Sequence, residues 1–311
     1  MNQPIRIAVV GPGAVGLFYS ARLAQAGADL SLLLRSDYEA VRARGIGVRS
    51  SGPELAIDPS RIHPFSRPED IGPVDLVLIT LKTTANPQFA ALIPPLLGPD
   101  TAILTLQNGL GSDELLTRQF GAERVLGGIS FIASTRVSPG VVECFHPGSI
   151  TLGEFGRPAS ERARNIAGWF ERAGIPCKVV DNLAEARWRK LVWNVPFNGL
   201  SIAAGGITTD KILADPLLAS EMRALMDEVA VAARALGFGI SERFIQGMID
   251  TTSSLGAYKT SSMIDWQAGR EVEVEPIWGE PLRRAAAAGA SCPKMALLLS
   301  LLRALCSVRA K

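Results

Sequence analysis

Three polar side chains recur at helical spacing in an otherwise apolar stretch in the second half of the chain. They are Lys190, Asn194 and Asn198, within the run from Trp188 to Asn198. A four-residue spacing places them on one face if this run is helical. Burying an ammonium and two carboxamides is costly without partners, so such a row usually faces a polar cleft or a ligand. The alternative is that Lys190 extends to solvent and the asparagines bond to backbone groups.

Lys190 has the chemistry of a proton donor. A carbonyl reduction needs such a donor at the oxygen that gains negative charge. Partial burial lowers the pKa of an ammonium group toward neutrality, which suits this role. The chain has only two histidines, His63 in a Pro/Arg-rich stretch and His146 just before Pro-Gly. Both contexts are typical of surface or turn residues, so Lys190 is the better candidate for the acid.

The N-terminus carries a cofactor-binding pattern. A short apolar run, residues 5–10, leads directly into Gly11-Pro12-Gly13-Ala14-Val15-Gly16, and a helical pattern follows as far as Gly27. Strand, GxGxxG and helix in this order are typical of a dinucleotide-binding fold. Gly11 would make the tight turn, Gly13 would let the backbone approach the pyrophosphate, and Gly16 would allow close packing of helix on strand. We expect all six residues of this loop to bind the cofactor.

The end of the second predicted strand bears on the choice of cofactor. This strand, residues 30–34, is followed by Arg35-Ser36. NAD-binding folds often carry Asp or Glu here, to bind the 2′-hydroxyl of the ribose. A guanidinium instead suits a 2′-phosphate, although Asp37 nearby opposes its charge and a solvated loop arginine is the alternative. The pattern favours NADPH over NADH.

Two further predicted strands end in polar residues. Residues 75–81 lead to Lys82, and residues 102–106 lead to Gln107-Asn108-Gly109. Ligands of this fold usually bind at the carboxyl ends of parallel strands. We therefore expect Lys82 and Asn108 to contact cofactor or substrate. For Asn108-Gly109 a simple turn is the alternative.

The pattern of elements changes near residue 181. Before it we expect a strand at 125–133, a hairpin reaching residue 153, a helix at 159–173 and a strand at 177–180. From residue 182 onward only helical patterns occur. The sequence thus predicts an α/β chain with a Rossmann-type domain at 1–181 and an all-helical domain at 182–311. The apolar helix at 295–305 is either core or a dimer contact, so a homodimer is left open.

Composition excludes several classes of protein. The chain has 311 residues, 47% hydrophobic and 20% charged, with a net charge of +2. This is a globular composition without an electrostatic case for nucleic acid or a membrane surface. The four cysteines lack CxxC spacing, which indicates neither a disulfide framework nor a metal site. No apolar run reaches the ~18 residues of a membrane span, and no signal peptide is evident. We therefore expect a cytoplasmic protein.

Taken in order, these motifs resemble the ketopantoate reductase (2-dehydropantoate 2-reductase) family over nearly the whole chain. The matching segments are Gly11 to Gly16, Leu81-Lys82, Gln107-Asn108-Gly109, Trp188 to Asn198, Thr260-Ser261-Ser262-Met263, and Gly269-Arg270 continuing to Glu273. The resemblance implies a Rossmann-type N-terminal domain and a helical domain of the 6-phosphogluconate dehydrogenase-like kind.

The resemblance also implies roles for single residues. Lys190 would be the general acid, and Glu273 would orient the substrate. Further contacts would come from Leu81 on the cofactor side, and from Asn108, Asn194, Asn198 and one of Ser261 or Ser262 on the substrate side. Without the resemblance, Glu273 is only one of three neighbouring acids, with Glu271 and Glu275.

The chain departs from the family pattern in two places. Pro196 lies between Asn194 and Asn198, where a proline is expected to kink a helix and shift Asn198. Pro276 and Trp278 stand after Glu273, where better-known members have other residues. Because both departures lie on the substrate side, they bear on the identity of the substrate more than on the chemistry.

The function predicted from sequence is the NADPH-dependent reduction of a small 2-keto acid, with 2-dehydropantoate as the first candidate. Hydride would pass to the keto carbon and Lys190 would protonate the oxygen. The rival enzyme class is an opine- or 3-hydroxyacid-type dehydrogenase. A non-catalytic NADPH-binding sensor is the alternative from a different class, and the complete polar row in 188–198 disfavours it.

Overall fold

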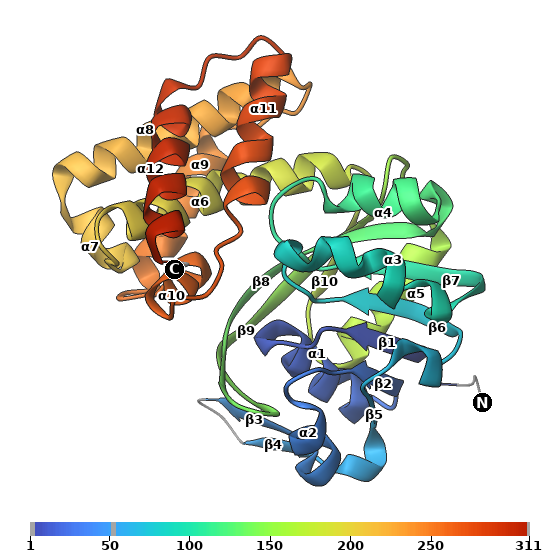
Figure 1. The fold of residues 1–311 in the computed structure, drawn as a ribbon. Helices are drawn as coiled ribbons and strands as arrows, with labels where there is room; N and C mark the ends of the chain where they lie inside the picture. Colours follow the sequence, from blue (N-terminus) through green and yellow to red (C-terminus); the bar gives the residue numbers. More distant parts are fainter. Residues whose placement is uncertain (1–3, 51–53, 310–311) are drawn as a thin grey trace. The chain divides into compact units, whose positions relative to one another are not determined.

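The computed structural model describes residues 4–50 and 54–309, which form two compact units. The first unit comprises Met1–Gln107 and Ser112–Leu183, and the second comprises Asn108–Gly111 and Ala184–Lys311. Figure 1 shows the first unit as a sheet with covering helices and the second as a group of helices. The short segment Asn108–Gly111 therefore belongs to the helical unit, although both its neighbours in sequence belong to the sheet unit.

The first unit is built on one mixed sheet of ten strands in the order β4-β3-β9-β8-β7-β6-β1-β2-β5, with β10 paired to β9. The strands are β1 (Arg6–Val10), β2 (Asp29–Leu33), β3 (Ile46–Ser50), β4 (Leu55–Ile57), β5 (His63–Phe65), β6 (Val74–Ile79), β7 (Leu97–Thr105), β8 (Val125–Ser138), β9 (Val141–Glu154) and β10 (Cys177–Val180).

The central strands are parallel and mostly apolar, because helices cover both faces of the sheet. β1 pairs in parallel with β2 on one side and β6 on the other. Its side chains alternate between two cores: Ile7 and Val9 belong to one, Ala8 and Val10 to the other. The order of the strands reverses at β1, which has β2 on one side and β6 on the other. Ligands of this fold usually bind at the carboxyl ends of the strands at such a point.

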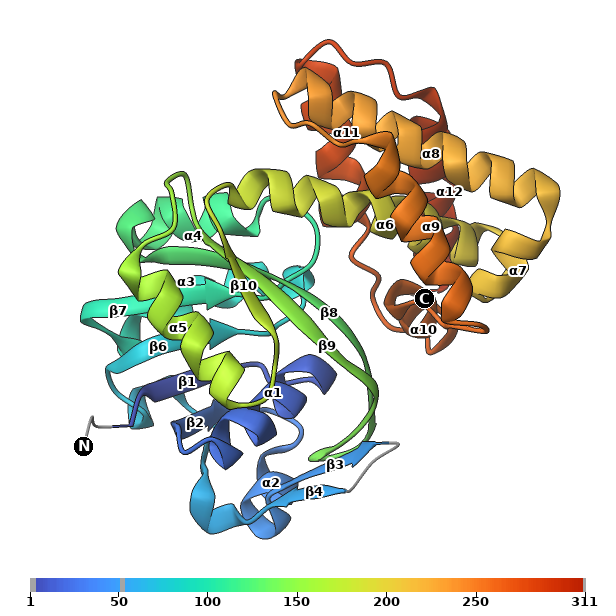
Figure 2. The ribbon, with the colours of Figure 1, turned by 180° about the vertical axis from the view of Figure 1, so that it is seen from behind.

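The helices of the first unit divide between these two faces. They are α1 (Ala14–Gln25), α2 (Tyr38–Arg44), α3 (Phe89–Leu92), α4 (Ser112–Phe120) and α5 (Glu161–Arg172), with 3₁₀ turns η1 (Pro59–Arg61), η2 (Pro68–Asp70), η3 (Thr83–Gln88), η4 (Pro94–Leu96) and η5 (Ala122–Arg124). Residues of α1 and α5 contribute to the core that contains Val9, and residues of α3 and α4 to the core that contains Val10. Figures 1 and 2 show these two faces from opposite sides.

The second unit is helical over its described residues. Its elements are α6 (Leu183–Ala203), α7 (Thr209–Ala214), α8 (Pro216–Ala235), α9 (Glu242–Ser254), α10 (Ser261–Gln267), the π-helical turn η6 (Glu275–Gly279), α11 (Glu280–Ala287) and α12 (Pro293–Arg309). One apolar core joins them, and α6 supplies much of it through Trp188, Leu191, Val192, Val195 and Phe197. Only a narrow part of the surface of α6 is therefore left for polar residues.

Helix α12 has two different faces. Met295, Leu298 and Leu302 are buried in the core of the helical unit, whereas Leu297 and Leu301 are exposed. The sequence left open whether this helix is part of the core or a dimer contact, and one of its faces is part of the core. No helix among the described residues is long and apolar enough to cross a membrane.

The predicted fold class is confirmed, with differences at the ends of elements. The strand expected at 75–81 stops at Ile79, and the strand expected at 125–133 continues to Ser138. The hairpin is confirmed by antiparallel pairing of β8 with β9. Three short strands were not predicted: β3, which lies between β4 and β9, and the edge strands β4 and β5, which have only three residues each.

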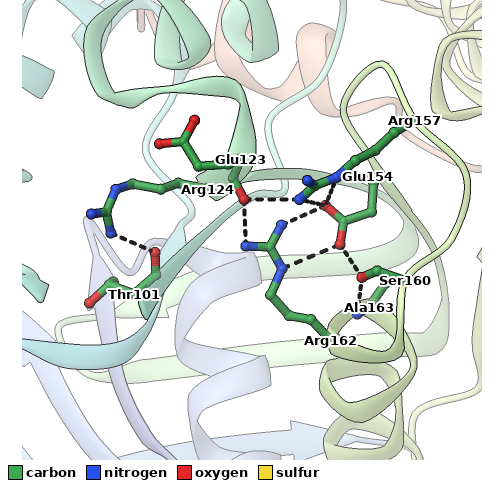
Figure 3. A network of polar contacts seen from close by, with 8 residues as sticks. All are labelled: Thr101, Glu123, Arg124, Glu154, Arg157, Ser160, Arg162 and Ala163. Atoms are coloured by element: carbon green, nitrogen blue, oxygen red, sulfur yellow. Dashed lines mark hydrogen bonds and ion pairs between the residues drawn. The ribbon is translucent and has the colours of Figure 1, made fainter. Parts of the chain in front are cut away.

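A buried carboxylate fastens the end of β9 to α5. The Glu154 side chain is fully buried and accepts hydrogen bonds from Arg162 (2.5 Å), Arg157 (3.0 Å) and the Ser160 hydroxyl. The same two guanidinium groups also donate to the backbone carbonyl of Glu123, as Figure 3 shows. Burial by itself raises the pKa of Glu154, but these hydrogen bonds outweigh it, so the pKa lies below its ordinary value.

We predict that Glu154→Gln lowers the free energy of unfolding by about 1.5–3 kcal/mol at pH 7, since it removes charge-assisted hydrogen bonds. A carboxyl whose pKa is lowered by folding stabilises the protein above its unfolded pKa, and this contribution is lost as the pH falls through the folded pKa. The difference between wild type and variant should therefore shrink as the pH falls below 4.5, the ordinary value. Urea unfolding at several pH values measures this.

Glu123→Gln is the matched control, because Glu123 enters the network only through its backbone carbonyl. It should leave stability nearly unchanged. A Glu154→Gln variant as stable as this control at pH 7 would show that the network adds nothing to stability.

Candidate active site

The glycine-rich loop follows β1 as the sequence predicts. Gly11 has a positive φ of 68°, and a Cβ added there would lie 2.0 Å from a methyl carbon of Leu81. A Cβ on Gly16 would lie 2.3 Å from the Thr80 hydroxyl oxygen, so this glycine permits the close approach of α1 to the strand end. Around Gly13, by contrast, the space is open within 4 Å. Of the three glycines, only Gly13 therefore has open space beside it, and this is the glycine at which we expect the pyrophosphate to approach the backbone.

The other loop residues complete the start of α1. Pro12 is buried, whereas Ala14 and Val15 are half-buried. The helix begins at Ala14, and the amide of Leu17 makes the first helical hydrogen bond to the carbonyl of Gly13. The amides before it have no partner within the helix, which is the arrangement that binds anions at helix N-termini.

Arg35 and Asp37 differ in their environments at the end of β2. Arg35 and Ser36 are exposed. Asp37 is buried, and its carboxylate forms an ion pair with Arg136 (2.5 Å) and accepts the amide of Gly140 (3.1 Å). Asp37 was expected to oppose the charge of Arg35, but its partner Arg136 lies 99 residues away in sequence and no local pattern predicts the pair. The negative charge that opposed the arginine is therefore compensated within the fold.

Lys82 and Gln107 lie at neighbouring strand ends in the sheet unit. Lys82 is exposed and precedes η3. Gln107 is buried, and its side chain donates to the amide oxygen of Asn86 (2.8 Å) while it accepts the Thr105 hydroxyl (3.1 Å). Gln107 is thus a structural residue that fixes the loop after β7.

Asn108 leaves the sheet unit immediately after Gln107. The amide of Leu110 donates to the carbonyl of Pro276 (2.9 Å), and Leu110 is buried in the helical core. A Cβ on Gly109 would lie 2.4 Å from that same carbonyl oxygen, and φ is +79° there. Asn108-Gly109 is therefore more than a simple turn, because Gly109 and Leu110 contact the π-helical turn η6, and Asn108 beside them is half-buried.

The polar row predicted on residues 188–198 exists on α6. Asn194 and Asn198 are 3% and 1% exposed, and Nδ2 of Asn198 donates to Oδ1 of Asn194 (3.4 Å). The helix runs through Pro196 without a break. The expected shift of Asn198 out of the row is therefore not observed. Proline removes one helical hydrogen bond, but the surrounding core holds the helix together.

The structure distinguishes the two serines. The amide of Ser262 donates to Oδ1 of Asn198 (3.1 Å), and Ser262 is buried. Ser261 is exposed. The Thr260 hydroxyl caps α10 by accepting the amide of Met263 (3.4 Å), which fixes the first turn of this helix against α6. Ser262 and not Ser261 thus joins the asparagine row.

The three neighbouring acids also have different environments. Glu275 is exposed and forms an ion pair with Arg303 (2.8 Å) on α12. Glu271 is exposed, whereas Glu273 is half-buried just before η6. The carbonyl of Glu273 accepts the amide of Ile277 (3.4 Å). A π-helical turn is rare and occurs frequently at functional sites, and here it follows the acid that the family resemblance selects.

Lys190 is half-buried on α6, and burial lowers its pKa from 10.5 to about 7. Its Nζ lies 5.6 Å from the centre of the Trp193 ring. That ring is held in turn by a hydrogen bond from its Nε1 to the Thr252 hydroxyl (2.9 Å). Trp193 lies within the predicted run, but no pattern in the sequence singled it out. A lysine with a pKa near neutrality can both donate and accept a proton under physiological conditions.

Among residues 4–50 and 54–309, no group of three or more His, Cys, Asp or Glu side chains is placed to hold a metal ion. The chemical groups gathered on the helical unit are an ammonium, carboxamides, a hydroxyl and a carboxylate. They suit the binding of a small oxygen-rich substrate and the transfer of a proton.

Comparisons with known proteins agree with this arrangement. The family model for ketopantoate reductase PanE/ApbA matches residues 7–157, and the model for its C-terminal part matches residues 182–306. A 2-dehydropantoate 2-reductase from Nostoc sp. is 36% identical over 300 residues, covering 95% of this chain and 93% of the relative.

Solved structures show the same fold. The crystal structure of 2-dehydropantoate 2-reductase from Geobacter metallireducens is 41% identical with a TM-score of 0.93, and the match covers 96% of this chain and 99% of that one. A D-mandelate dehydrogenase solved with NADH and anilino(oxo)acetate has a TM-score of 0.88 at 20% identity, covering 98% and 99% of the two chains. This second likeness concerns the fold alone. On the two family models and the Nostoc relative together, the chain is an oxidoreductase that belongs to the ketopantoate reductase family.

Proposed function

We propose that this protein reduces a small 2-keto acid with NADPH, and that the physiological reaction is the conversion of 2-dehydropantoate to pantoate for pantothenate synthesis. The observation that carries the proposal is the position of Lys190, which precedes Asn194 and Asn198 at four-residue spacing on α6. Burial lowers the pKa of this lysine to about 7. The names of the relatives supply the substrate.

The cofactor would bind to the sheet unit, which we propose acts as a cofactor-binding domain of residues 1–181. The open space at Gly13 and the amides at the start of α1 fit a pyrophosphate, and Leu81 and Lys82 lie at the neighbouring strand end. Arg35, exposed after β2, would bind the 2′-phosphate. The cofactor supplies the hydride when it is bound.

On the helical domain, residues 182–311, the asparagine row would orient the substrate. The backbone amide of Ser262 donates to Oδ1 of Asn198 and so fixes the orientation of this side chain. Nδ2 of Asn198 then donates to Oδ1 of Asn194. Asn194 therefore points its amide donors onward, where they can bind a substrate carboxylate or hydroxyl. Asn108 and Glu273 would add contacts from the segments joined at η6. Such fixed donors do not have to reorient during the reaction.

Lys190 would protonate the oxygen as it gains negative charge. Its lowered pKa makes the ammonium a stronger acid than an exposed lysine. The four free cysteines are consistent with the reducing cytoplasm, where we place this reaction.

The test of the proposed function is NADPH oxidation with a panel of 2-keto acids. We expect turnover with branched or hydroxylated members, 2-dehydropantoate above all, and no turnover when a keto acid and an amino acid must be joined. Lys190→Ala should lower kcat and kcat/KM by ~10²–10⁴-fold, the usual effect of a positioned acid, and leave the Kd for NADPH nearly unchanged.

Lys211→Ala, an exposed lysine of the same unit, serves as the control and should keep full activity. If Lys190→Ala keeps a normal kcat and only raises KM, then Lys190 binds the substrate carboxylate and is not the acid. No turnover on any keto acid would contradict the proposed function itself.

The pH dependence should reveal the same group. Reduction requires the protonated lysine, so kcat/KM for the keto acid should be highest below the pKa and fall as the pH rises through it. Oxidation of the hydroxy acid requires the neutral lysine, so its kcat/KM should rise over the same range. The inflection should lie at about 7 or above, because an anionic cofactor raises the pKa of a nearby ammonium. Profiles with parallel slopes in the two directions would contradict the assignment.

Arg35→Ala should weaken the binding of NADPH by about 1.5–3 kcal/mol and that of NADH much less, since only NADPH carries the 2′-phosphate. Fluorescence titration of both cofactors measures the two affinities. Arg118→Ala, which removes an exposed arginine of α4, is the control. Equal losses for both cofactors would show that Arg35 does not recognise the 2′-phosphate.

A further inference from the structure

We infer that Arg136 determines the preference for NADPH over NADH by cancelling the charge of Asp37. The inference rests on the proposed use of NADPH, and it assigns a specificity-determining role to a residue that would not need to touch the cofactor. It starts from an ion pair at the end of β2, beside the exposed Arg35.

The carboxylate of Asp37 is hydrogen-bonded to the residue that follows Arg35, the residue proposed to bind the 2′-phosphate. The Ser36 hydroxyl, next to Arg35, donates to Oδ1 of Asp37 (3.0 Å). Nη1 of Arg136 lies 2.5 Å from the same Oδ1 and 3.4 Å from the Ser36 oxygen. The amide of Gly140 donates to Oδ2 (3.1 Å), so the carboxylate is held in place from both sides.

An acid after the second strand usually has the opposite effect. In NAD-binding folds it accepts a hydrogen bond from the 2′-hydroxyl and repels a 2′-phosphate. Asp37 is only 2% exposed, so water screens its charge poorly, and its effect on a nearby phosphate would be strong. A chain that presents Arg35 for a phosphate must therefore compensate Asp37.

Arg136 provides this compensation from a distant part of the sequence. It lies near the end of β8, just before the turn that contains Gly140, and its side chain is 44% exposed. The pairing makes Asp37 and Arg136 neutral as a unit and leaves the charge of Arg35 uncancelled. On this reading the net charge of the Asp37–Arg136 pair sets the selectivity.

The competing explanation is that the ion pair only anchors the β8–β9 turn to the loop before α2. A structural role of this kind predicts a loss of stability and equal effects on both cofactors. The charge mechanism predicts that the ratio of the two affinities follows the net charge of the pair, whatever happens to stability.

A series of variants of the full-length protein separates these explanations. Arg136→Gln leaves the pair with one negative charge but keeps a donor for Asp37, so that it can fold. Arg136→Lys and the double variant Asp37→Asn with Arg136→Gln keep the pair neutral. Asp37→Asn gives it one positive charge. The Kd values for NADPH and NADH are measured for each by fluorescence titration, at low and at high salt.

The matched control is Arg157→Gln. Arg157 also pairs with a buried carboxylate, Glu154, and the two pairs have similar exposure: 42% and 0% here, against 44% and 2% for Arg136 and Asp37. This variant disturbs the same kind of interaction far from Arg35 along the sheet order. It should lower stability without changing the ratio of the two Kd values.

We expect Arg136→Gln to lower the preference for NADPH about 10-fold at low salt and less at high salt, because salt screens the repulsion. The two neutral variants should keep the wild-type preference, and Asp37→Asn should exceed it. If Arg136→Gln does not fold, the comparison of Asp37→Asn with the double variant still decides the question. An affinity ratio that stays constant across the series overturns the inference.

The result also separates this inference from the proposed function. A wild-type protein that prefers NADPH, with a ratio that the variants do not change, refutes only the role of Arg136. A wild-type protein that binds NADH as well as NADPH refutes the proposed cofactor preference and the inference with it.

Discussion

The main constraint on the helical unit is that α6 carries Lys190, Asn194 and Asn198 although most of its surface packs into the apolar core. The cost of burying these groups is met in two ways. Asn194 and Asn198 bond to each other, and the amide of Ser262 completes the chain. Lys190 stays partly exposed, and its pKa falls to about 7. The burial that weakens the charge of this lysine is also what suits it to proton transfer near neutral pH. Stability and chemistry are therefore opposed at this residue, and the core of α6 must compensate for it.

A second constraint is steric and lies at η6. The π-helical turn leaves the carbonyl of Pro276 available to the amide of Leu110, and Gly109 has no side chain to obstruct that contact. The segment Asn108–Gly111 is thereby held by the helical unit, although the sheet unit supplies both its flanks. Glu273, two residues before η6, and Asn108, next to Gly109, thus both adjoin this contact in sequence. A substitution at Gly109 would disturb both, since any side chain there meets backbone atoms.

Two buried carboxylates of the sheet unit are paired in the same way. Glu154 is paired with Arg157 and Arg162, and Asp37 is paired with Arg136. In each case the arginine is partly exposed and the acid is not, so the pair places its positive end toward solvent. Asp37 can therefore be buried near the carboxyl end of β2 without making that end of the sheet negative. Arg35, outside these pairs, keeps its charge for a ligand.

The sequence by itself determined the features that depend on residues close together in the chain. The glycine loop follows from the conformation that each glycine permits, the row on α6 from helical periodicity, and the α/β class from alternating apolar runs. The tertiary structure alone showed that Ser262, and not Ser261, is bonded to Asn198, because these two residues are 64 positions apart. It likewise set Glu273 apart from its exposed neighbours and assigned Arg136 to Asp37 across 99 residues. Local patterns record which side chains share a face, whereas only packing brings together groups that no period connects.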